Sequence, residues 1–249
     1  MDIQKREYFT DIHYKPFLFF VVFGVTGEEL EISAGRHHVD RFPAKLELRS
    51  FNRAVHADYI DGFFAGHLGN VLKDSDPELF DACRLTENCV IISGQIEEDQ
   101  NLDYMRNVIG IIQAFTEKGV TGILDLMTFS LFSPVEWKER FFEKEINAQN
   151  HTVILVSEEE NGYWLHTRGM TEFGRPDFSI HDVKENEIIE YKEILDQMIF
   201  YGGQGVFFNG DYTLHTYSGK TCRINSVFVN DFENDDFNNA YCNVSVKEE

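Results

Sequence analysis

The sequence predicts an α+β fold in which helices pack on a mixed β-sheet and the C-terminal part is rich in strands. Residues 88–132 show a strand, a helix and a second strand in succession, which is the pattern of a β-α-β unit. After residue 150 the pattern changes to short strand-forming runs separated by turn residues. Hydrophobic residues make up 43% of the 249 positions, too many for a disordered acidic chain. We expect a single domain over residues 1–249, with a subdivision near residue 150 as the alternative.

The first predicted strand is the most apolar run of the chain, Phe17–Val25. It is much shorter than the roughly 20 residues of a membrane-spanning helix, and the residues before it mix acids with bases, unlike the leader of a signal peptide. We therefore expect a central strand buried on both faces, in a cytoplasmic protein. A second strand is predicted at Ala44–Leu48.

Two helices are predicted before the β-α-β unit. Apolar residues recur at spacings of three and four from Val55 to Leu68, which predicts a helix despite its glycines. Asp76 and Pro77 then begin a short helix, because Asp is a favoured N-cap and Pro is favoured at the first helical position.

The β-α-β unit is the clearest pattern in the chain. It contains a strand at Cys89–Ile96, a helix at Leu102–Lys118 capped by Asn101 and ended by Gly119, and a strand at Gly122–Phe132. We expect the two strands to run parallel, since a helix connects them.

A capping-box pattern at Ser133–Glu136 predicts that another helix begins there and continues to about residue 147. The remaining elements are a hairpin of two strands, a helix and three or four short strands. They are predicted at His151–Glu158, Gly162–Thr167, Glu187–Tyr201 and Gly205–Val246.

The charge of the chain excludes one class of function and favours another. Asp and Glu number 43 and Lys and Arg 22, giving a formal net charge of −21. Affinity for duplex nucleic acid depends on cationic side chains, so a nucleic-acid partner is excluded, and no membrane partner is expected. The acidity is strongest in residues 151–249, which hold 7 basic and 18 acidic side chains. An acidic surface accelerates association with a basic protein, which is the partner we expect.

The candidate binding residues follow a predicted strand and surround two glycines and a proline. They are His166, Arg168, Glu172, Arg175 and Asp177. The arginines have the paired donors that bind a carboxylate or phosphate, and the carboxylates have the chemistry of an acid or base. The alternative is that the four charged residues pair with one another and fasten a loop against the sheet.

A Y-x-L-H-T pattern occurs twice in the chain, and its histidines, His166 and His215, offer with Asp177 the ligand types of a metal site. No metal-ligand spacing supports it. The four cysteines also lack C-x-x-C spacing, so we expect reduced thiols, no metal and no cofactor.

The turn at Thr167–Asp177 reads T-x-G-M-x-x-F-G-x-P-D. With the preceding long helix, the G-I-L-D-L strand at residue 122 and the helix start at Ser133, it resembles the bacterial family catalogued as domain of unknown function 4261, over roughly residues 15–245. That family has no assigned catalytic residues. The resemblance implies an association with bacterial immunity and interaction neighbourhoods, not a known reaction.

Two functions remain open from the sequence. The favoured one is a non-catalytic protein-binding module of the immunity or antitoxin type, since the chain is acidic and contains no assembled catalytic set. The alternative is a hydrolase-like enzyme or small-ligand binder that uses the Thr167–Asp177 turn. An open pocket at the turn favours the enzyme, and closed contacts favour the binding module.

Overall fold

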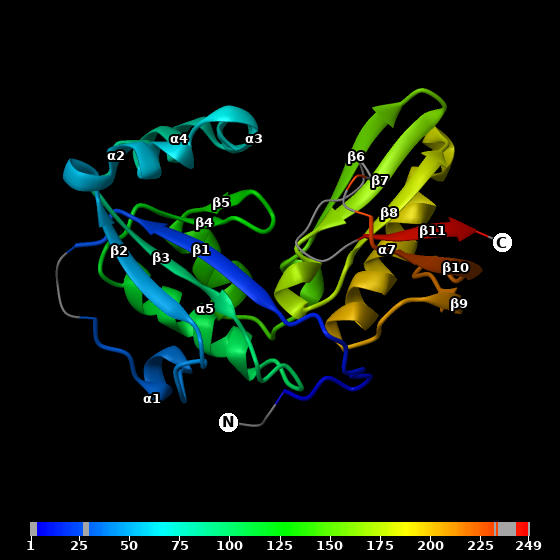
Figure 1. Ribbon diagram of the computed structural model, residues 1–249, viewed down its shortest axis with the longest axis horizontal. Coiled ribbons are helices and arrows are strands. Elements are labelled where there is room, and N and C mark those ends of the chain that lie inside the picture. Colours follow the sequence, from blue (N-terminus) through cyan, green and yellow to red (C-terminus); the bar gives the residue numbers. More distant parts are fainter. Residues whose placement is uncertain (1–3, 27–29, 232, 234–242, 249) are drawn as a thin grey trace. The chain divides into compact units, whose positions relative to one another are not determined.

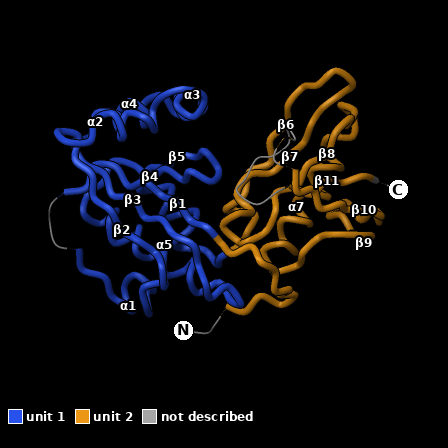
Figure 2. The backbone as a smooth tube through the Cα atoms, in the orientation of Figure 1, with its two compact units in different colours: residues 1–3, 17–146 blue, residues 4–16, 147–249 orange. Residues whose placement is uncertain are grey.

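The computed structural model describes residues 4–26, 30–231, 233 and 243–248. The chain forms two compact units (Figure 2). Unit 1 contains Phe17–Ile146, and unit 2 combines the early segment Gln4–Pro16 with the chain from Asn147 onward. The α+β prediction is confirmed, with two sheets where the sequence predicted one. In the described parts of the chain, no helix is long and apolar enough to cross a membrane.

The sheet of unit 1 is antiparallel throughout, with the strand order β2-β3-β1-β4-β5 (Figure 1). Its strands are β1 (Phe17–Phe23), β2 (Glu47–Asn52), β3 (Asn88–Gln95), β4 (Gly122–Asp125) and β5 (Ser130–Phe132). The prediction of a central, buried first strand is confirmed, because Leu18 and Val21 on β1 are both fully buried and neighbouring strand residues point to opposite faces. The second strand begins later than predicted, at Glu47, because Lys45 adopts a left-handed φ of 65°.

Helices cover both faces of this sheet (Figure 1). They are α1 (Ala34–His37), α2 (Arg53–Gly62), α3 (Gly66–Ser75), α4 (Pro77–Arg84), α5 (Asp103–Thr116) and α6 (Pro134–Trp137). Ile60, Leu72 and Phe80 from α2–α4 share one core with Val21 and Phe23 of β1. The opposite face is covered by α5, most of whose residues are buried.

Three predictions for unit 1 need correction. The helix predicted at Val55–Leu68 is broken into α2 and α3, because Gly66 takes a left-handed φ of 61°. The strand predicted at Gly122–Phe132 is the β4–β5 hairpin, whose turn is held by the buried carboxylate of Asp125. The helix after the confirmed Ser133 capping box ends in a π-helical turn at Phe142, earlier than predicted.

The β-α-β prediction is confirmed in strand direction only. Strands β3 and β4 both run antiparallel to β1 and therefore parallel to each other. They are not neighbours, because β1 lies between them. A local sequence pattern gives the direction of two strands but not the strand that separates them.

The sheet of unit 2 is mixed, with the order β6-β7-β8-β11-β10-β9 and a parallel pair at β8–β11. Its strands are β6 (Val153–Glu159), β7 (Gly162–Arg168), β8 (Asp177–Val183), β9 (Gly210–His215), β10 (Thr221–Val229) and β11 (Asn243–Glu248). The predicted β6–β7 hairpin and the three late strands are confirmed. Helix α7 (Ile188–Gly203) is confirmed as well, with Leu195 and Met198 fully buried.

Candidate functional site

The predicted turn between β7 and β8 brings its candidate residues together but closes them from solvent. Glu172 and Asp177 are 0% exposed and Arg175 is 1% exposed, while His166 is buried on β7 and Arg168 is half-buried at its end. Gly169 and Gly174 hold left-handed φ values of 121° and 61°, which is the conformational role expected of these glycines.

Arg175 is bound by backbone oxygens. Its guanidinium donates to the carbonyl oxygens of Gly174 (2.8 Å), Val206 (3.1 Å), Thr10 (2.7 Å) and Gly205 (2.6 Å). Its Cζ also lies 5.6 Å from the centre of the Phe9 ring. A planar guanidinium with five donors suits this cradle better than any other side chain.

Arg6 repeats this arrangement from the early segment of unit 2. It is 4% exposed and its Cζ lies 5.5 Å from the Phe9 ring. It donates to the carbonyl oxygens of Gly203 (2.9 Å), Phe173 (2.9 Å) and Gly202 (3.1 Å). The last carbonyls of a helix have no intrahelical partner and carry partial negative charge, so Arg6 stabilises the C-terminus of α7. Sequence reasoning missed this role of Arg6, and no local pattern signals it.

The carboxylates of the turn are held by its own backbone and neighbours. Asp177 accepts from the Thr167 hydroxyl at 2.7 Å and from the Met170 amide at 3.3 Å. Glu172 lies 3.3 Å from Nδ1 of the buried His151. The turn is therefore closed and structural. It differs from the predicted ion-pair alternative, because Arg175 donates to backbone carbonyl oxygens.

A second polar array, which sequence reasoning missed, lies on β6–β8. His181 donates from Nδ1 to a Glu159 carboxylate oxygen at 2.8 Å, and its Nε2 faces the Ser179 hydroxyl oxygen at 3.4 Å. Trp164 donates to the same hydroxyl at 2.7 Å and stacks on His181 with ring centres 5.5 Å apart. The rings of Trp164 and His166 are also stacked, with their centres 3.8 Å apart.

This array has the connectivity of a nucleophile, a base and a group that orients the base. Burial acts to raise the pKa of Glu159, but bonds from the Asp182 amide and from His181 outweigh it and hold that pKa below its ordinary value. Ser179 is fully buried, while the His181 side chain is 35% exposed. Alternation on a strand places Ser179 and His181 on one face, and this spacing is the signal that sequence reasoning could have used.

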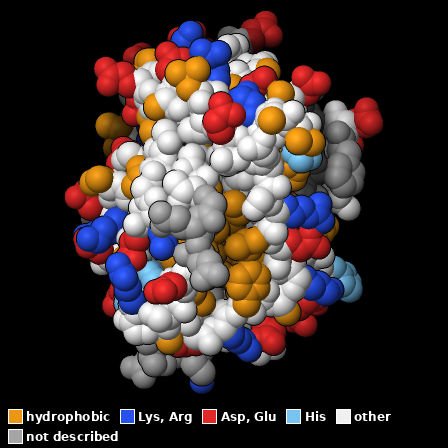
Figure 3. All heavy atoms as spheres, turned by 90° about the vertical axis from the view of Figure 1, so that its left-hand side faces the viewer, with side chains coloured by type: hydrophobic (Ala, Val, Ile, Leu, Met, Phe, Trp, Pro, Cys, Tyr) orange, Lys and Arg blue, Asp and Glu red, His pale blue; other side chains and the backbone are white. Residues whose placement is uncertain are grey.

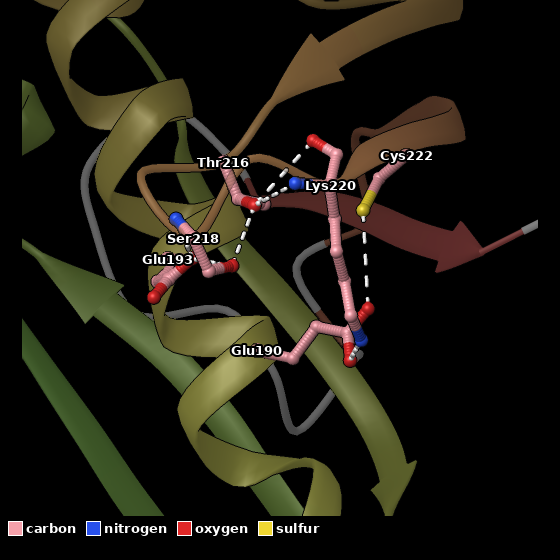
Figure 4. A network of polar contacts seen from close by, with 6 residues as sticks. All are labelled: Glu190, Glu193, Thr216, Ser218, Lys220 and Cys222. Atoms are coloured by element: carbon pink, nitrogen blue, oxygen red, sulfur yellow. Dashed lines mark hydrogen bonds and ion pairs between the residues drawn. The ribbon is translucent and has the colours of Figure 1, made fainter.

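A third network joins α7 to the turn between β9 and β10 (Figure 4). Its members are Glu190, Glu193, Thr216, Ser218, Lys220 and Cys222. Glu193 accepts from the hydroxyl and amide of Ser218, at 2.8 and 3.2 Å, and these bonds lower its pKa. Lys220 pairs with Glu190. These contacts fix the turn against the helix.

The metal alternative gains no support from the strand order. His166 lies on β7 and His215 on β9, which are not neighbours in the sheet. Within the described ranges, no group of three or more His, Cys, Asp or Glu side chains could hold a metal ion.

Unit 1 carries an open surface hollow of about 720 Å³ beside α5 and α6. Arg36, Glu117, Lys138 and Glu139 contribute to its lining, so both signs of charge occur there. A mixed lining of this kind selects no single class of ligand. Comparison with known proteins adds no template either, since no protein-family model, curated protein or solved structure matches the chain.

Proposed function

We propose that the protein is a non-catalytic, acidic binding module of the immunity or antitoxin type, which docks onto a basic protein partner. The net charge of −21 is the observation that carries this proposal. Such a field accelerates encounter with a cationic surface and disfavours anionic partners.

A cluster of exposed carboxylates supports unit 2 as the docking part. In unit 1 basic side chains pair with acids, as in Arg41–Glu98 and Lys45–Glu97, and Figure 3 shows both signs interspersed on one face. The two units carry nearly equal net charge, because the segment Gln4–Pro16 adds three basic and two acidic side chains to the 7 basic and 18 acidic ones of residues 151–249. Four exposed carboxylates lie at one end of the β6–β8 strands, where β6 and β8 end: Glu158, Glu160, Asp182 and Glu185.

The closed turn at Thr167–Asp177 weighs against a catalytic role for its carboxylates and so favours the binding module. A catalytic carboxylate must reach its substrate, whereas Glu172 and Asp177 are fully buried. Arg175 is occupied by four carbonyl oxygens, so its donors are not available to a bound anion.

Co-purification from the native host tests the proposal. A basic protein should be recovered at about 0.1 M salt and lost near 1 M, where the screening length falls from about 10 to about 3 Å. Recovery of no basic protein at low salt would count against a docking role. Neutralising the four carboxylates of unit 2 to amides should slow association several-fold.

A matched control neutralises four exposed acids of unit 1 and changes the net charge equally. These are Asp58, Asp74, Glu78 and Glu87. If the control slows association as much as the unit 2 variant, the docking surface is not localised to unit 2.

A second function is favoured by one observation, the Glu159–His181–Ser179 array. In this alternative Ser179 is the nucleophile of a hydrolase, His181 the base and Glu159 the orienting group. The full burial of Ser179 weighs against it. A fluorophosphonate probe should label the wild type and not the Ser179→Ala variant, and absence of wild-type labelling would exclude this role.

A further inference from the structure

Strand β6 is the outermost strand of the unit 2 sheet. It pairs with β7 along its whole length, from Val153 opposite Arg168 to Glu159 opposite Gly162, without a register shift. On its other side, no strand or loop backbone pairs with it among the described residues. The edge therefore presents backbone N–H and C=O groups in a regular, extended array.

The side chains of β6 leave this edge open on both faces of the sheet. Leu155 and Val156 are 38% and 37% exposed, and neighbouring residues of a strand point to opposite faces. Edge strands are usually protected by charged side chains, Pro or a bulge. Residues Val153–Ser157 of β6 contain none of these, and its charges are confined to Glu158 and Glu159 at its end. Residues Val153–Val156 of β6 are all apolar, although exposed edge strands usually avoid a run of apolar residues.

The other long edge strands of the two sheets differ in this respect. In β2, Arg49 pairs with Glu47 within the strand, so charge occupies its centre. In β9, Asp211 is bonded to Asn225 of the adjacent strand, and the strand begins at Gly210 with a left-handed φ of 126°. Both features are protective, which distinguishes β6 as the accessible edge.

Charge is concentrated at the C-terminal end of β6. Its first residues are apolar, whereas Glu158 and Glu160 at its end are exposed and Asp182 of β8 lies at the same end of the sheet. An incoming antiparallel strand would place its N-terminal end beside these carboxylates. Charge complementarity then requires Lys or Arg at that end and apolar residues after it.

We propose that the outer edge of β6 binds an extended segment of a partner protein as an additional antiparallel strand, with Lys or Arg at the N-terminal end of that segment and apolar residues beside Val153–Val156. This rests on the proposed function and names the surface that carries it. A second copy of the chain is a poorer occupant, because it would bring a further charge of −21 to the acidic end. Backbone bonds supply affinity in such additions, and side chains supply specificity.

Three peptides test the proposal by fluorescence anisotropy with the full chain. KKVTVTV should bind, and the reversed peptide VTVTVKK should bind about fivefold more weakly because its lysines meet the apolar end. The same KKVTVTV peptide with N-methyl groups on alternate amides should not bind, since it cannot form the ladder. Hydrogen exchange should slow at β6 amides on addition of the first peptide.

Two matched variants locate the surface. Leu155→Lys on β6 should weaken KKVTVTV binding about tenfold, since a cation on an edge strand repels the peptide lysines and removes an apolar contact. Leu48→Lys on edge strand β2 is the control, because Leu48 is 37% exposed, and it should leave binding unchanged. Both positions are partly exposed, so circular dichroism and thermal unfolding should show intact folds.

Several outcomes would overturn the proposal. These are equal binding of the N-methylated peptide, equal effects of the two lysine variants, and a wild-type dimer that Leu155→Lys converts to a monomer. If a basic partner is recovered from the host and Leu155→Lys still binds it while the peptides do not bind, the edge proposal fails and the proposed function stands. If the peptides bind as expected but no basic partner is recovered, the proposed function fails alone.

Discussion

Replacement of Arg175 by methionine tests the junction at the end of α7. The substitution keeps the length of the side chain but removes every donor to the four carbonyl oxygens, which lie 2.6 to 3.1 Å from the guanidinium nitrogens. A hydrogen bond to a charged group is worth roughly 1.5–3 kcal/mol, but bonds to one group are not additive. Breaking a buried charged network typically costs about 3–5 kcal/mol, and we expect Arg175→Met to lower the unfolding free energy by that amount.

Such a loss is a large part of the roughly 5–15 kcal/mol that stabilises most proteins. Urea unfolding followed by circular dichroism measures it, and hydrogen exchange should show faster exchange in Gln4–Pro16, which Arg175 binds through Thr10. The control is Arg223→Met, at an exposed position on β10, with an expected change within about 0.5 kcal/mol. A loss below about 1 kcal/mol for Arg175→Met would refute the importance of the cradle.

Three further predictions concern packing and titration. Gly110→Ala should lower the unfolding free energy by about 1–3 kcal/mol, because its Cβ would overlap a carbonyl oxygen of α1. The control is Gly62→Ala, whose Cβ meets no atom within 4 Å and which should be neutral or slightly stabilising. Thermal melts compare the two variants, and equal effects would contradict this prediction. Burial raises the pKa of Cys83 to about 12 and that of Cys89 to about 11, so a thiol reagent at pH 8 should modify them only after unfolding, and rapid labelling of the folded protein would be inconsistent with that burial. Although burial acts to raise it, the pKa of Glu159 lies below its ordinary value of 4.5 in the folded protein. The ionised side chain therefore stabilises the fold above pH 4.5, and this effect is lost as the pH falls through the folded-state pKa. Unfolding curves of Glu159→Gln should lack this part of the acid destabilisation, and an unchanged acid profile would argue against it.

Elements specified by nearby residues were predictable from the sequence. The Asp76 N-cap, the Ser133 capping box and the β6–β7 hairpin each depend on residues within a few positions of one another, and all three occur as predicted. The break before Gly66 and the turn at Asp125 depend on backbone conformations that hydrophobic periodicity does not report.

The sequence predicted where the candidate residues lie together, but it did not predict that they are buried. The five residues of the turn do lie together, because the strand before them and the glycines within them are local features. Their burial depends on Arg6 and Phe9, which are more than 150 residues away in sequence, as the bond from Arg6 to Phe173 shows. The Glu159–His181–Ser179 array similarly depends on the pairing of three strands, which a single sequence does not reveal.

The division of unit 2 into two segments has a consequence for synthesis of the protein. Unit 1 is inserted between Pro16 and Asn147, so it can fold as soon as its last strand and helix leave the ribosome. Arg6, in contrast, binds a carbonyl 197 residues further along the chain. At about 5–20 residues per second, that acceptor follows roughly 10–40 s later. The segment Gln4–Pro16 is therefore made before unit 1 but can complete its contacts only after unit 1 has been made.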